Sequence, residues 1–128
     1  VIPNHYFSGD EHAVLVVVLT DGSFVRSEAF TSGERMRILW EDTAMALGSV
    51  MMRVKPEEVV RIKFFHTHPL RKVEGLEIGL VVSPEDVESS RWDQKQILYS
   101  YGIKIPFDVI AIPVDAGFIT SHTMPALP

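Results

Sequence analysis

Two histidines separated by a single residue, His66 and His68, stand at the end of an apolar run. A carboxylate, Asp86, follows downstream in a Ser-Pro-Glu-Asp segment that has the form of a helix start. Two histidines and one aspartate make a three-ligand set that leaves the fourth position of a tetrahedral metal open for water. That pattern is typical of a catalytic rather than a structural zinc site. The sequence therefore predicts a water-activating metal site that needs one further residue, a general base.

The spacing of these residues favours a shared site. Residues two apart on a strand point to the same face, so His66 and His68 can reach one ion. Pro69 biases His68 toward an extended backbone, which keeps that alignment to the strand end. Ser83 is a favourable N-cap, and Asp86 then falls three residues later, where the helix dipole favours an ionised carboxylate.

Length and composition indicate one globular domain over residues 1–128. The hydrophobic share of 46% and the charged share of 23% are ordinary for a packed chain. Cysteine is absent, so a metal must use histidine and carboxylate ligands, and the composition fits a cytoplasmic location. The net charge of −5 disfavours nucleic acid as the main partner. The longest apolar run, residues 13–19, is far too short to span a bilayer, so we expect no membrane segment.

The first elements of the chain predict a strand, a hairpin and a helix. Residues 13–19 form a β-branched run without polar alternation, which predicts an inner strand buried on both faces. The Asp-Gly pair that follows predicts a tight turn, with residues 23–30 returning as the antiparallel neighbour. Thr31 and Glu34 match a capping box, and we expect a helix from there to about Val54.

The remaining elements bring the order to β-β-α-β-α-β. Residues 59–65 predict the strand that ends at the histidine pair, and residues 83–102 a helix stopped by Gly102. The other expectations are a lead-in loop over 1–10, a loop over 70–82, a strand over 107–112 and a frayed tail over 122–128.

A glutamate before a buried strand, then His-x-His-Pro, then Ser-x-x-Asp, resembles the signature of the JAMM/MPN (JAB) metalloprotease domain. Glu11, His66-Thr67-His68-Pro69 and Ser83-Pro84-Glu85-Asp86 fill its positions in order. The RadC-like branch is the most similar, and the resemblance spans roughly residues 11–121. It implies an α/β fold of three layers, α-β-α, with a mixed, curved sheet flanked by helices, of the cytidine-deaminase-like kind.

The resemblance also implies a role for each residue. His66, His68 and Asp86 would be Zn²⁺ ligands, Glu11 would deprotonate the catalytic water, and Ser83 would stabilise the developing oxyanion. The implied reaction is hydrolysis of amide bonds in a protein or peptide substrate, including isopeptide bonds to ubiquitin-like proteins. The RadC-like branch has no agreed substrate.

One departure from the family pattern leaves an alternative open. Seventeen residues, 69–85, separate His68 from Asp86, which is more than the family usually has. We interpret the excess as an insertion within 70–82, beside the site and able to shape substrate access. The alternative is that Glu74 or Glu77 supplies the carboxylate.

Competing functions remain open at this stage. Each signal alone has a simpler explanation: a chance histidine pair, an ordinary helix cap and a solvated glutamate at a strand start. A catalytically silent MPN scaffold or binding module is the main alternative to a zinc peptidase. A cupin-like metal enzyme is a weaker one, because His66, His68, Glu74 and Gly79 only loosely imitate a first cupin motif. Zinc content and the activity of a Glu11→Gln variant would discriminate among them.

Overall fold

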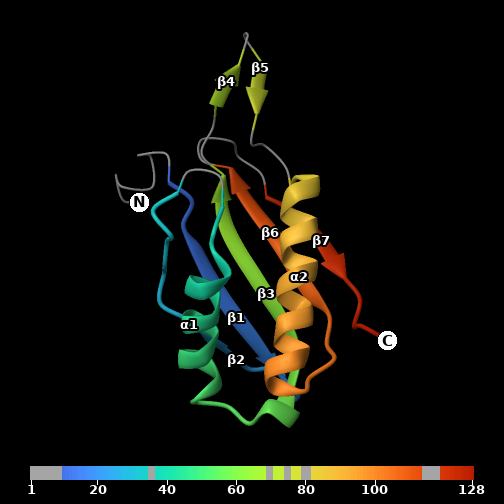
Figure 1. Ribbon diagram of the computed structural model, residues 1–128. Helices are drawn as coiled ribbons and strands as arrows, with labels where there is room; N and C mark the ends of the chain where they lie inside the picture. Colours follow the sequence, from blue (N-terminus) through green and yellow to red (C-terminus); the bar gives the residue numbers. More distant parts are fainter. Residues whose placement is uncertain (1–9, 35–36, 69–70, 74–75, 79–81, 114–118) are drawn as a thin grey trace.

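The computed structural model describes residues 10–34, 37–68, 71–73, 76–78, 82–113 and 119–128 (Figure 1). Its two α-helices are α1 (Trp40–Met51) and α2 (Pro84–Tyr101), and a short 3₁₀ turn, η2 (Pro56–Glu58), precedes the third strand. The strands are β1 (Ala13–Leu19), β2 (Phe24–Arg26), β3 (Val59–His68), β4 (Arg71–Val73), β5 (Leu76–Ile78), β6 (Phe107–Pro113) and β7 (Thr120–Met124). Within these residues neither helix is long and apolar enough to cross a membrane.

Five strands form one mixed sheet in the order β2-β1-β3-β6-β7. Strand β3 lies at its centre, antiparallel to β1 and parallel to β6, while β2 and β7 are antiparallel edge strands. The chain is therefore of the mixed α/β class, as predicted. Figure 1 shows the start of β1, the end of β3 and the start of α2 at the same end of the molecule, where the separate β4–β5 hairpin projects beyond the sheet.

The predicted hairpin between β1 and its neighbour is confirmed, although β2 is shorter than expected. Gly22 has a positive φ of 85°, and the Asp21 side chain accepts the Ser23 amide at 2.9 Å, so the turn is fixed locally. After β2, the amide of buried Ser27 still donates to the Leu15 oxygen at 2.8 Å, while its hydroxyl, rather than its carbonyl, accepts the Leu15 amide at 3.0 Å.

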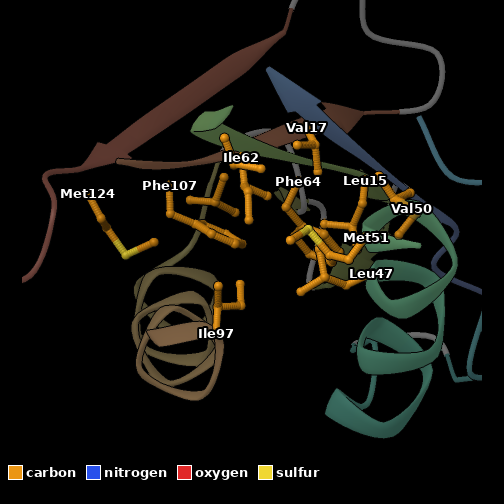
Figure 2. Packing of buried hydrophobic residues seen from close by; sticks show 13 residues of the cluster. Leu15, Val17, Leu47, Val50, Met51, Ile62, Phe64, Ile97, Phe107 and Met124 are labelled. Atoms are coloured by element: carbon orange, nitrogen blue, oxygen red, sulfur yellow. The ribbon is translucent and has the colours of Figure 1, made fainter. Parts of the chain in front are cut away.

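The hydrophobic core lies between one face of the sheet and both helices (Figure 2). Alternate residues of β1, Leu15 and Val17, meet Leu47 and Val50 of α1, while Ile97 of α2 completes the same cluster. Such alternation is what a half-buried strand produces.

The opposite face of β1 corrects one prediction. Val14, Val16 and Val18 on that face are only half-buried, so this inner strand is not buried on both faces. The two described helices pack on the same face of the sheet, and the predicted three-layer arrangement is not confirmed.

The predicted start of the first helix is wrong. Helix α1 begins at Trp40, after an N-cap Leu39 that offers no side-chain hydrogen bond. The Thr31 hydroxyl instead donates to the backbone oxygen of Glu11 at 2.6 Å, and the Glu34 side chain pairs with Arg37. A partner 20 residues away has therefore taken the Thr31 hydroxyl, and a neighbour three residues away has taken the Glu34 carboxylate, so the two groups do not form the cap.

The predicted frayed tail is also wrong for residues 122–124. Residues 120–124 form β7 and pair with β6, and Met124 is 2% exposed. Gln94 of α2 then donates its side-chain amide to the backbone oxygens of Ile105 and Pro125, at 3.1 and 2.9 Å. These bonds fix the chain beyond β7 against the helix. The lead-in loop predicted over 1–10 lies outside the described residues apart from Asp10.

Candidate metal centre

The two histidines lie side by side at the end of β3, on the face that carries the core. Phe64 precedes them on this face, and its ring stacks on that of His66 with centroids 5.4 Å apart. His66 and His68 are 2% and 6% exposed, and their Nε2 atoms are 2.8 Å apart. The prediction that both imidazoles point the same way is confirmed.

Asp86 reaches the histidines from the first turn of α2. The predicted Ser83 N-cap is confirmed, and it forms a capping box: the Asp86 amide donates to the Ser83 hydroxyl at 3.1 Å, and the Ser83 amide donates to Asp86 Oδ2 at 2.9 Å. The same Oδ2 lies 2.9 Å from Nε2 of His68 and 3.3 Å from Nε2 of His66. The cap therefore orients the carboxylate toward the histidine pair.

The surroundings of Asp86 favour its ionised form. Partial burial alone would raise its pKa, but hydrogen bonds from His66 and His68, the charge of His66 and the Ser83 amide lower the pKa well below its ordinary value. Asp86 is thus a carboxylate throughout the physiological range, which is the state that binds a cation.

Glu11 completes the cluster from the residues just before β1. Ala13 pairs with His66 across the sheet, and continuing this register by two residues sets Glu11 opposite His68. The Glu11 side chain is buried, and its Oε1 lies 3.8 Å from Nε2 of His68. This antiparallel register thus brings residues far apart in the sequence onto one face of the sheet.

One ligand atom each from Glu11, His66, His68 and Asp86 lies within 4.8 Å of the others, so the group is within reach of one metal ion. The contacts fit a cation: two imidazole nitrogens and a carboxylate oxygen within 3.3 Å direct their lone pairs at one another unless a positive charge or proton lies between them. Imidazole and carboxylate donors suit zinc and several other divalent transition metals. The donor set fits a metal without identifying which one.

One feature departs from the usual support of a metal-binding histidine. A ligating imidazole commonly donates its second N–H to a carboxylate, carbonyl or water. Nδ1 of His66 is buried and has no hydrogen-bond partner among the described residues. Stacking against Phe64, the edge contact with His68 and the contact of Nε2 with Asp86 orient this ring.

The side chains of the other candidate carboxylates lie outside the part of the chain that the structure describes. Glu74 lies outside the described residues, as does Gly79 of the cupin-like pattern, and only the backbone of Glu77 is described, within β5. Asp86, the preferred candidate, is the carboxylate that the structure brings to the histidines.

Sequence reasoning missed three hydroxyls that hold the backbone beside the cluster. Thr31 donates to Glu11, Thr67 accepts the His12 amide at 2.9 Å, and Thr120 accepts the Val82 amide at 3.1 Å. These contacts join segments 20 to 55 residues apart. A threonine in such a contact has no local signature, whereas one in a helix cap has a recognisable spacing.

The fold and the cluster together define a mixed α/β protein with a buried group of two histidines and two carboxylates. Comparison with protein-family models, with curated proteins and with solved structures found no match. The resemblance to the JAMM/MPN domain therefore stays a prediction, and function must be argued from the geometry of the site.

Proposed function

We propose that the protein is a metal-dependent hydrolase, specifically a zinc-dependent peptidase of the JAMM/MPN type with a RadC-like arrangement. The observation that carries the proposal is the convergence of Glu11, His66, His68 and Asp86 in a buried cluster within reach of one ion. Three of these residues suffice to hold a catalytic metal, and the fourth can act on water.

Each residue takes the role that its position supports. His66, His68 and Asp86 would hold the metal through Nε2, Nε2 and Oδ2, the atoms that face one another. When bound there, zinc would supply a Lewis acid that lowers the pKa of water toward ~7. Glu11 Oε1 lies 3.8 Å from Nε2 of His68, farther away than Asp86 Oδ2 at 2.9 Å. Glu11 therefore takes the role of the base, which accepts the proton of the attacking water and passes it to the leaving amine.

Ser83 is proposed to stabilise the oxyanion that develops on the substrate carbonyl. Its Oγ accepts the Asp86 amide and is thereby held beside the cluster. The hydroxyl keeps its hydrogen as a donor, since no described residue accepts it. One such donor typically contributes about 10²–10³-fold in kcat where it meets an oxyanion.

The proposed substrate is an amide bond in a protein or peptide, including isopeptide conjugates of ubiquitin-like proteins. The β4–β5 hairpin is inserted in the chain between the histidines and Asp86, and it lies at the same end of the molecule as the cluster. This position supports a role in selecting which substrates reach the site. A cytoplasmic location and the three-layer JAB-like fold belong to this proposal as well.

The test combines metal analysis with one pair of variants. Purified protein is expected to contain about one zinc per chain by mass spectrometry, and to hydrolyse peptide or isopeptide substrates. Glu11→Gln should retain the metal and lose activity by roughly 10²–10⁴-fold, since it removes the general base. Glu28→Gln makes the same chemical change at an exposed position and should retain full activity.

The outcomes separate the proposal from its main alternative. Protein that binds no divalent metal and hydrolyses nothing would refute the peptidase. Zinc-bound protein that is inactive toward all substrates would favour the silent MPN scaffold.

A further inference from the structure

We propose that Thr31 is a positioning residue that holds Glu11 in place through its backbone. The inference rests on the proposed function, because it concerns the glutamate assigned there as general base. It explains why a Thr-x-x-Glu pattern that looks like a helix cap does not begin a helix: α1 starts at Trp40.

Both backbone polar groups of Glu11 bond to the loop formed by residues 31–34. The Glu11 amide donates to the backbone oxygen of Glu34 at 2.9 Å. The Thr31 hydroxyl donates to the Glu11 carbonyl at 2.6 Å. Two hydrogen bonds to one short loop leave the Glu11 backbone little freedom to move.

The orientation of the Thr31 hydroxyl is itself fixed. The Gly33 amide donates to Thr31 Oγ1 at 3.1 Å, so this oxygen acts as an acceptor toward the loop. A threonine has a single hydroxyl hydrogen, which is then directed at the Glu11 carbonyl. Gly33 has a φ of 71°, a left-handed conformation that glycine adopts freely and that turns its amide toward Thr31.

The position of Glu11 makes this support necessary. Glu11 precedes β1, whose ladder with β3 begins at the Ala13–His66 pair, and residues outside a ladder open most readily. Its carboxylate must nevertheless stay within one water of the histidines, because a displacement of about 1 Å can cost on the order of 10²-fold in rate. The residue after Glu11, His12, is held by Thr67, whose hydroxyl oxygen accepts its amide. Glu11 itself is held by loop 31–34.

The experiment uses Thr31→Val, which removes the hydroxyl and keeps the branched shape, with Thr31→Ser as the conservative control that keeps it. Each is made in the wild-type chain and in a Glu11→Ala background. The first measurement is amide hydrogen exchange at residue 11, compared with Val17 in the centre of β1. The second is the dissociation constant for Co²⁺, followed by visible absorption.

We expect Thr31→Val to speed exchange at residue 11 but not at Val17. It should also weaken Co²⁺ binding roughly tenfold, because the Glu11 carboxylate is a negative charge 3.8 Å from the His68 ligand and moves away when its backbone is released. Thr31→Ser should match the wild type in both. In the Glu11→Ala background Thr31→Val should have no further effect on Co²⁺ binding, because Thr31 acts through Glu11.

Three results would overturn the inference. These are unchanged exchange at residue 11 in Thr31→Val, unchanged Co²⁺ affinity in the wild-type background, or an equal loss of affinity with and without the Glu11 side chain. Failure of wild-type protein to bind Co²⁺ would refute the proposed function and with it the role of Thr31 in a metal site. The exchange data would then decide separately whether the hydroxyl holds the Glu11 backbone.

Discussion

Asp93 of α2 should make the stability of the fold depend on pH in an unusual direction. It lies on the buried side of the helix with 8% of its surface exposed, and this burial raises its pKa to about 7. An aspartate in the unfolded chain has an ordinary pKa of about 3.9. Between these two values the folded protein binds one more proton than the unfolded protein. The free energy of unfolding therefore falls as pH rises from about 4 to about 7, and the loss is complete above 7.

The size of the effect follows from the shift. Each unit of pKa difference corresponds to 1.36 kcal/mol, and about two units lie between pH 5 and pH 7. Asp93→Asn keeps the shape of the side chain and removes its ionisation. From pH 5 to pH 8 the variant should gain about 3 kcal/mol in free energy of unfolding relative to the wild type.

Urea unfolding followed by circular dichroism at pH 5, 6, 7 and 8 measures this difference. Glu88→Gln on the exposed side of the same helix is the matched control, and its difference from the wild type should not vary with pH. A stability difference for Asp93→Asn that is equally flat would refute the reasoning, since it would mean that the Asp93 carboxylate ionises normally in the folded protein.

Three further predictions concern two buried hydroxyls and a proposed metal ligand. Thr43→Val should raise the free energy of unfolding by about 1 kcal/mol in urea titrations, because Thr43 Oγ1 is buried without a partner among the described residues. Ser27→Ala should instead lower it, because that buried hydroxyl bonds to two backbone groups. Asp86→Ala should abolish stoichiometric zinc binding by equilibrium dialysis, since it removes an ionised ligand, whereas Glu85→Ala beside it should leave one zinc per chain.

The parts of the site that were predictable from sequence are those whose partners are local. Ser83 and Asp86 satisfy each other within one helical turn, so their spacing determined their geometry. His66 and His68 share a face because strand geometry has a period of two. Neither argument required knowledge of the rest of the chain.

The predictions that failed concern segments whose partners lie far away in the sequence. Thr31 and Glu34 have the spacing of a cap, but the backbone of Glu11, 20 residues from Thr31, bonds to the Thr31 hydroxyl and to the backbone oxygen of Glu34. Residues 120–124 are mostly polar and look like a tail, yet pairing with β6 makes them an edge strand, where polar side chains face water. Local propensity is a weak prior wherever such tertiary contacts compete with it.

Glu11 illustrates why the site depends on sheet register more than on any single motif. Nothing about a glutamate before a strand marks it as functional, and the family resemblance alone singled it out. In the structure its place follows from the Ala13–His66 pair, which sets it beside His68 on the core face. A register slip of one residue would turn its carboxylate to the opposite face of the sheet. The loop that bonds its amide and carbonyl therefore fixes both the position of a proposed catalytic group and the alignment that creates the site.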